Sequence, residues 1–189
     1  MRASRTPVKI LVPLCVGALL CVTILVNASE TTGGQTMKLT VTSPAFAEGE
    51  MIPSKYTCDG ADVSPPLQIN GIPEGAKSFA LISDDPDAPR GTWVHWVLYD
   101  WPVSSPTFPE NLPKVGELPN GAKQGITDFR RLGYGGPCPP SGTHRYYFKV
   151  YALDVVLGKP AGLTKAQLLD AMKGHILAEG MLMGRYKRK

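Results

Sequence analysis

The sequence predicts a mainly β domain, a sandwich of sheets that ends in a C-terminal helix. Short runs with strand patterns lie far apart along the chain, and a long Pro- and Gly-rich stretch, residues 102–142, separates the last two of them. After residue 36, helical spacing of apolar residues is found only near the C-terminal end. This pattern favours stacked sheets over alternating βαβ units. The length of 189 residues and the 43% hydrophobic composition are typical of one globular domain.

Four segments carry the strand patterns. The first and the last alternate apolar and polar residues, whereas the second is apolar on both faces, as in a strand buried on both sides. In the third segment, alternation would put His95 on the same face as Trp93 and Val97. The last segment would place His144 and Tyr146 on one face. In chain order the four segments are 37–42, 77–83, 93–99 and 144–153.

Helix signals begin at Thr164. Thr164 and Gln167 have the spacing of a capping box, and Leu163 and Leu168 have that of a hydrophobic staple. Apolar residues then continue at helical spacing, namely Leu168, Leu169, Met172 and Ile176. We therefore expect a C-terminal helix, and we expect His175 on that helix to be structural.

The first 28 residues have the composition of a secretory signal. Arg2, Arg5 and Lys9 precede an apolar run at 10–26, and the residues up to Ala28 suit a signal peptidase. The run of 17 residues is also close to the length of a membrane span, so an uncleaved anchor is the alternative. The protein would then be exported, either periplasmic or extracellular, or held at the inner membrane by its leader. The expected divisions are 1–28 (signal peptide or anchor), 29–36 (flexible lead-in) and 37–189 (domain).

The charge of the chain argues against a nucleic-acid partner. Three of the 20 Lys and Arg residues lie in the leader, which has no acidic residue, so the remainder has 17 basic residues against 16 acidic ones. A nearly neutral domain lacks the broad basic footprint of a nucleic-acid-binding protein. The basic C-terminal residues, RYKRK, are expected to be solvated charge.

The cysteines divide in the same way. Cys15 and Cys21 lie in the leader, and the domain keeps Cys58 and Cys138. Two cysteines in an exported domain are compatible with one disulfide or with a reduced pair, and we predict the disulfide. The sequence contains neither C-x-x-C nor H-E-x-x-H, so we expect no zinc site.

Polar residues suited to ligand binding flank two of the expected strands. An acid-rich turn precedes the third strand, and a glycine-rich loop, GYGGPCPPSG, precedes the last. If these strand ends lie on one rim, two imidazoles and a carboxylate converge on a pocket walled by Trp93 or Tyr146, and the loop could supply an anion nest. Alternatively, each histidine is a satisfied core residue and Asp before Pro only starts a turn. The candidates are Asp85, Asp87, His95 and His144.

Other chemistries have weaker signals. No G-x-S-x-G elbow is present, so a serine hydrolase has no evident nucleophile. The residues from Gly133 begin like a dinucleotide loop, but the prolines that follow, Pro137, Pro139 and Pro140, exclude the helix that such a loop requires. Two histidines with Asp85 could form a two-His-one-carboxylate metal site, and this alternative stays open.

Four motifs in one order identify a resemblance. They are YTCDGADVSPPL, DDPDAP followed by WVHW, GYGGPCPPSGTHRYYF, and GHILAEGMLMGRYKR. Together they resemble the phosphatidylethanolamine-binding protein family, in particular its bacterial Raf-kinase-inhibitor-like branch, and the resemblance covers residues 38–188. Each motif alone is moderately specific for the family, and the four motifs in this order are a strong indication of it.

The resemblance implies a Greek-key antiparallel β-sandwich with a C-terminal helix, small peripheral helices and an anion pocket at one end. In the family this pocket binds phosphate-bearing groups. Arg130 stands where the family often has glycine, which bears on the geometry of that loop and on the charge at the pocket mouth. The resemblance and the crowded turn also favour a cis peptide at Ala88–Pro89. The matched pocket positions are Asp85, Asp87, Pro89, His95, Gly135, Pro137, His144 and Tyr146.

Three functions are therefore open. The first is an exported, non-enzymatic binding protein for a small anionic or phosphate-bearing ligand such as a phospholipid headgroup, without cofactor or metal. The second is an interaction protein that inhibits a kinase or protease through the pocket rim and residues 102–120. The third is a hydrolase that uses Asp85, His95 and His144 as a metal or acid–base site. In the first case we expect Asp85 to orient an imidazole rather than to contact the anion.

Overall fold

The computed structural model describes residues 37–188. The expected leader (1–28), the lead-in (29–36) and Lys189 lie outside the described residues. Within the described part of the chain, no helix has both the length and the apolar character needed to cross a membrane.

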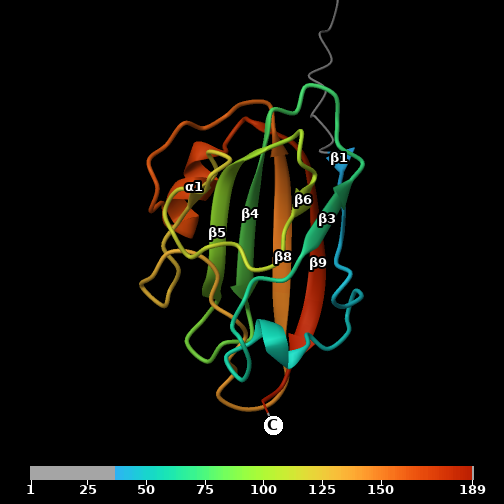
Figure 1. Cartoon of the computed structure of the whole chain (residues 1–189), viewed down its shortest axis with the longest axis vertical. Helices are drawn as coiled ribbons and strands as arrows, with labels where there is room; N and C mark the ends of the chain where they lie inside the picture. Colours follow the sequence, from blue (N-terminus) through green and yellow to red (C-terminus); the bar gives the residue numbers. More distant parts are fainter. Residues whose placement is uncertain (1–36, 189) are drawn as a thin grey trace, which may run out of the picture. The chain divides into compact units, whose positions relative to one another are not determined.

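Two sheets of unequal size form the described part of the chain (Figure 1). In the larger sheet β1 pairs with β9 in parallel and the other neighbours are antiparallel. Its strands, in spatial order, are β1 (Met37–Lys38), β9 (Ile176–Tyr186), β8 (His144–Leu153), β4 (Ser78–Asp85), β5 (Trp93–Pro102) and β7 (Lys123–Gln124). The smaller, antiparallel sheet is β2 (Thr40–Thr42), β3 (Leu67–Asn70) and β6 (Thr107–Phe108). The predicted mainly β fold is confirmed, and the strand order is consistent with a Greek key.

Hydrophobic side chains cover both faces of the larger sheet. Ile69 of the smaller sheet and Leu81 of β4 belong to one buried cluster, which fills the space between the sheets. On the opposite face, Ile82 and Val97 cluster with Leu168 of the helix α1 (Lys165–Ala171). The strand β4 is therefore buried on both faces along its whole length, as its continuous apolar pattern predicts.

The C-terminal part of the chain differs from the prediction. The capping box at Thr164 forms as predicted, but α1 ends at Ala171. Gly174 then adopts φ = 78°, a left-handed conformation typical of residues that follow a helix. From Ile176 the chain forms β9, an 11-residue strand that pairs with β8. The expected continuation of the helix to Ile176 is therefore wrong.

Two glycines in β9 explain why the sequence pattern hid this strand. A Cβ on Gly180 would lie 2.3 Å from the carbonyl oxygen of Leu39, and one on Gly184 would lie 2.5 Å from the side chain of Ile52. The β9 backbone thus approaches its neighbours more closely than a side chain would allow. Each glycine also interrupts the alternation of apolar and polar residues by which a strand is predicted.

The shorter elements refine the prediction. The segment 37–42 divides at Leu39, so that β1 and β2 lie in different sheets. Strand β3 was not predicted, and the irregular stretch from 102 to 142 contains β6 and β7. A single 3₁₀ turn, η1 (Ser54–Tyr56), is the small peripheral helix of the described region. Strand β8 has the bounds that its alternation predicts.

Candidate functional site

A β-bulge at the start of β5 determines the direction in which the His95 side chain points. Ser83 of β4 pairs with Trp96, whereas the next residue, Asp84, pairs with Val94, so His95 is the extra residue of β5. A bulge of this kind bends the strand and redirects its side chains. Strict alternation, on which the sequence prediction relied, therefore fails at His95.

His95 lies on the face of the larger sheet that meets the smaller sheet. The rings of Phe129 and Tyr146 meet its imidazole edge-on, each with 5.2 Å between ring centroids. Tyr146 belongs to the core between the sheets, whereas Val97 belongs to the cluster under α1. The prediction that His95 and Val97 share a face is therefore wrong.

The hydrogen bond of His95 fixes the position of its proton. Nδ1 lies 2.7 Å from the carbonyl oxygen of Gly135. A carbonyl oxygen can only accept, so Nδ1 carries the hydrogen and Nε2 of the neutral ring offers a lone pair. Burial lowers the pKa of His95 below its ordinary value, which keeps the ring neutral at pH 7. Nε2 has no hydrogen-bond partner in the described part of the chain.

Asp85 orients the second histidine. Nδ1 of His144 donates to Oδ2 of Asp85 at 2.8 Å, and both side chains are almost fully buried. The other carboxylate oxygen, Oδ1, accepts the backbone N–H of Asp87 at 2.8 Å. Both oxygens of Asp85 thus have partners, and Asp85 orients the imidazole of His144 as we expected.

Tyr146 adds a hydrogen-bond donor to the two histidines. Its side chain is 1% exposed, and its hydroxyl has no hydrogen-bond partner among the described residues. Burial, followed by the nearby Asp85 carboxylate, raises the pKa of Tyr146 well above its usual value, so the hydroxyl keeps its hydrogen. Ser83, two residues before Asp85, carries another buried hydroxyl without a partner. Unpaired buried hydroxyls cost about 1–3 kcal/mol each and are rare in native structures.

The acid-rich turn sends its two candidate carboxylates in different directions. Asp87 accepts hydrogen bonds from Nε and Nη2 of Arg145, at 2.9 and 2.7 Å, and from the backbone N–H of Arg145 at 2.9 Å. These bonds lower the pKa of Asp87 to about 2. Asp87 therefore stabilises the turn at the rim, while Asp85 points inward to His144. No peptide bond of residues 37–188 is cis, so the predicted cis bond at Ala88–Pro89 is wrong: the turn separates the carboxylates without it.

The glycine-rich loop supports His95. The N–H of Gly135 donates to the carbonyl oxygen of His95 at 2.8 Å, and the N–H of Gly136 donates to Oδ1 of Asp62 at 2.6 Å. These two donors are therefore used within the protein, and the expected anion nest stays a prediction. A Cβ on Gly135 would lie 2.6 Å from the ring of Phe129, and one on Gly136 would lie 2.6 Å from the carbonyl oxygen of Tyr56. Only glycine fits these two positions.

A disulfide and an ionic cluster hold this loop to residues 57–62. Cys58 and Cys138 are joined by a disulfide with 5.4 Å between their Cα atoms. The backbone N–H of Cys58 donates to the carbonyl oxygen of Pro137 at 3.1 Å, so Pro137 helps to fix the loop. Asp62 also accepts hydrogen bonds from Lys114 and Arg131, at 2.7 and 3.2 Å. Distant segments are thus fixed around the histidines.

Phe129 is a site residue that the sequence analysis did not single out. Its ring contacts His95 and Trp93, with 5.2 and 5.5 Å between ring centroids. The next residue, Arg130, has φ = 60°, a left-handed conformation that glycine adopts without strain. The backbone therefore keeps the conformation that a glycine favours, although Arg130 stands there.

The structure brings together five of the eight predicted pocket positions. These are Asp85, His95, Gly135, His144 and Tyr146. Asp87 lies at the rim on Arg145, and Pro137 supports the loop. Pro89 is exposed in the turn between β4 and β5. His175, expected on the helix, lies after it and pairs with Asp154 at 2.9 Å on the surface.

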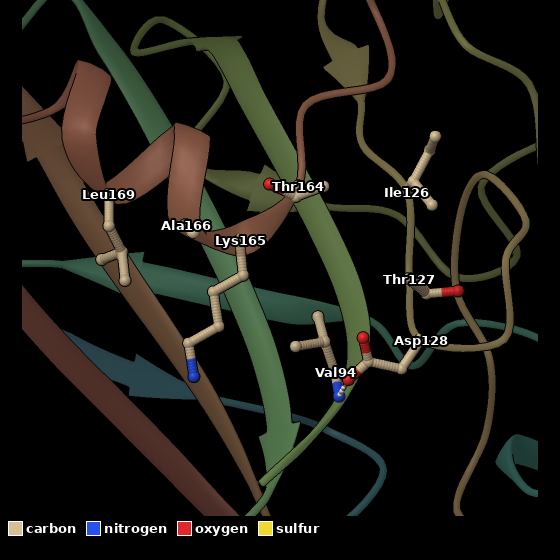
Figure 2. Close-up of a pocket in the computed structure, with 8 residues that line it drawn as sticks. All are labelled: Val94, Ile126, Thr127, Asp128, Thr164, Lys165, Ala166 and Leu169. Atoms are coloured by element: carbon tan, nitrogen blue, oxygen red, sulfur yellow. Dashed lines mark hydrogen bonds between the residues drawn. The ribbon is translucent and has the colours of Figure 1, made fainter.

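A separate cavity of about 370 Å³ lies on the other side of β5 (Figure 2). Val94 lines it, whereas the next residue, His95, points to the opposite face of the sheet. The polar residues of this cavity have partners: Oδ2 of Asp128 accepts the N–H of Val94 at 2.7 Å, and Lys165 is hydrogen-bonded to Asp84. Its lining is Val94, Ile126, Thr127, Asp128, Thr164, Lys165, Ala166 and Leu169.

A larger cavity, of about 950 Å³, lies over β1, β2 and β9. Neither cavity is lined by His95 or His144, whose exposed fractions are only 3% and 7%. We place the candidate site at the histidines, because hydrogen-bonding atoms without partners gather there. The small exposed fractions suit a ligand group of a few atoms. Within residues 37–188, no group of three or more His, Cys, Asp or Glu side chains is arranged to hold a metal ion.

This geometry defines a class of protein: a two-sheet β domain with a compact His/Asp/Tyr cluster held by a glycine-rich loop. The model of the phosphatidylethanolamine-binding protein family matches residues 42–187. The chain belongs to this family.

Curated relatives and solved structures agree with this membership. UPF0098 proteins of Methanothermobacter thermautotrophicus and Aquifex aeolicus are 54% and 53% identical, over 76% and 82% of this chain and 95% and 91% of theirs. The crystal structure of a putative phosphatidylethanolamine-binding protein homologue from Chlamydia trachomatis matches with a TM-score of 0.74 and 43% identity, over 80% of this chain and 99% of that one. E. coli YbcL, a member of the mammalian PEBP family, matches with a TM-score of 0.74 and 33% identity over the same shares.

Proposed function

We propose that the protein is a binding protein for a small anion of the phosphate type, held by His95, His144 and Tyr146. The observation that carries the proposal is the buried hydroxyl of Tyr146, a donor without a partner in the described residues, next to two imidazoles with free Nε2 atoms. A hydroxyl donates well to an oxyanion, and so does an imidazole that carries a hydrogen on its free nitrogen. The family description, phosphatidylethanolamine-binding protein, supports this ligand chemistry.

The absence of a recognisable nucleophile motif favours binding over hydrolysis. Asp85 fixes His144 through Nδ1, and the carbonyl oxygen of Gly135 fixes His95 through Nδ1. The sequence has no G-x-S-x-G elbow to supply a nucleophile for the histidines to activate. The site therefore offers donors and acceptors in fixed positions, which is what recognition of a small ligand requires.

Calorimetric titration with inorganic phosphate tests the proposal. The His144→Ala variant should bind phosphate about ten- to 150-fold more weakly than the wild type, because it loses one charge-assisted hydrogen bond of roughly 1.5–3 kcal/mol. The chain offers a matched control in His175→Ala, which removes another imidazole paired with an aspartate, but on the surface. Equal phosphate binding by the wild type and His144→Ala, with both folded, would contradict the proposal.

We also propose that the protein is exported. The basic residues, the apolar run and the small residues of 1–28 support this, as does a disulfide, which persists in oxidising compartments. Sequencing the N-terminus of protein recovered from cells should find Ser29 or a near neighbour. If the protein in the membrane fraction still begins at Met1, the leader is an uncleaved anchor and the predicted cleavage is wrong.

A further inference from the structure

The free atoms of the histidine cluster are of two kinds. Tyr146 offers a hydroxyl hydrogen, whereas Nε2 of His95 offers a lone pair, because Nδ1 of that ring already carries the hydrogen that bonds Gly135. Ser83 Oγ and Tyr146 Oη are the fully buried side-chain atoms without partners in residues 37–188, so Nε2 of His95 keeps access to solvent. A ligand at this cluster therefore meets an acceptor as well as donors.

Negative charge lies close to this acceptor. The charged and titratable groups around the ring come from three elements, and two carboxylates on β4 are among those that act on it. A ligand atom that presents only lone pairs to Nε2 would leave the acceptor unpaired and would lie near the Asp85 carboxylate, whereas an O–H would pair with it. The neighbouring groups are Asp84 and Asp85 on β4, His144 and Tyr146 on β8, and Asp62 and Arg131 beside the glycine-rich loop.

We propose that the site selects an anion that carries its own proton, namely hydrogen phosphate or a protonated phosphomonoester, over sulfate and over phosphodiesters. The inference rests on the proposed function and narrows its ligand class. A diester, such as the phosphate of an intact glycerophospholipid, has one negative charge and no P–O–H. It can accept from Tyr146 and His144, but it has nothing to donate to His95.

Phosphate and sulfate form a matched pair of ligands for the test. Both are tetrahedral oxyanions of similar size. At pH 7 inorganic phosphate keeps at least one proton and sulfate keeps none, so sulfate carries at least as much charge. Charge attraction alone therefore predicts that sulfate binds at least as well as phosphate, and only recognition of the P–O–H reverses that order. Dimethyl phosphate, a diester with a single charge and no proton, separates the lipid-type ligand from free phosphate.

Calorimetric titration of the wild-type protein with the three anions at pH 7 should show phosphate binding at least tenfold more tightly than sulfate or dimethyl phosphate. That ratio corresponds to one unmade hydrogen bond that leaves a buried acceptor unpaired. The preference should shrink in His95→Gln, whose side-chain amide can present a donor or an acceptor, and should persist in His175→Gln.

Each outcome decides between the two proposals. Sulfate or dimethyl phosphate binding within threefold of phosphate overturns the selection for a protonated anion and leaves the anion site standing. A preference for phosphate that His95→Gln keeps unchanged also overturns it, because the selection then arises elsewhere. If none of the three anions binds the folded wild-type protein, the anion-binding function itself is wrong, and the selection fails with it.

Discussion

Single hydrogen bonds decide what each polar residue of the site can do. Asp85 and Asp87 stand two positions apart in an acidic turn, yet Asp85 orients His144 and Asp87 binds Arg145. His95 and His144 also differ, because the Nδ1 partner of one is a carbonyl oxygen and that of the other a carboxylate. The sequence could nominate these four residues by their types, but it could not assign their partners, which come from segments 40–60 positions away.

The Asp87–Arg145 pair predicts a pH dependence of stability with a definite sign. The folded state lowers the pKa of Asp87 from 3.8 to about 2. The pair therefore stabilises the fold above about pH 4, and this contribution is lost as the pH falls toward 2. Because the Asp87 side chain is 28% exposed, screening by solvent limits the contribution to about 1 kcal/mol.

Urea unfolding of Asp87→Asn tests this dependence. The variant should have a lower free energy of unfolding than the wild type at pH 7, and the difference should disappear near pH 2. Asp170→Asn is the control, because the Asp170–Lys173 pair is exposed and should contribute little at either pH. A difference that is the same at both pH values would show that the ionic pair does not stabilise the turn.

At the scale of elements, secondary structure was predicted correctly where it depends on a local sequence pattern. It was not predicted where it depends on contacts with distant segments. In β8, buried residues alternate with more exposed ones along most of the strand, so the bounds of the strand could be predicted from its sequence. Strand β9 was not predicted, because its two glycines are required by close contacts with Leu39 and Ile52, which lie far away in the chain. The bulge at His95 has no local signature either, since it is defined by the register with β4.

The close approach at Gly180 can be tested by substitution. Gly180→Ala would place a Cβ against the Leu39 backbone, at 2.3 Å, so β9 or the segment at Leu39 must move. We expect a loss of about 1–3 kcal/mol in the free energy of unfolding, measured by urea denaturation. Met181→Ala, at the next position of β9 and 57% exposed, should cost less than about 0.5 kcal/mol. Equal effects of the two substitutions would contradict the tight contact.

At the scale of the whole domain, the long connection between Cys58 and Cys138 holds the site together. The disulfide closes a loop of 80 residues that includes β4, β5 and the first part of the glycine-rich loop. In the chain-entropy model, a loop of this length is worth about 4 kcal/mol. We expect the double variant Cys58→Ser, Cys138→Ser to unfold at a correspondingly lower urea concentration. Reductant should destabilise the wild type and leave the variant unchanged; free thiols in the untreated protein would contradict the pairing.

The family and the mainly β fold could be recognised from sequence because four motifs keep their order along the chain. The site needed the three-dimensional structure. Phe129 and Asp62 reach the cluster from separate loops, and nothing in their local sequence marks them as neighbours of the histidines.

The most direct test of the account is a titration of ¹⁵N-labelled protein with inorganic phosphate, followed by NMR of the histidine side chains. The chain has three histidines, so each imidazole can be assigned by substitution. We predict saturable shifts of the Nε2 resonances of His95 and His144, with no saturable shift at His175, which lies on the surface with Asp154. The account would be contradicted if His95 and His144 kept their resonances at saturating phosphate, or if all three histidines shifted together.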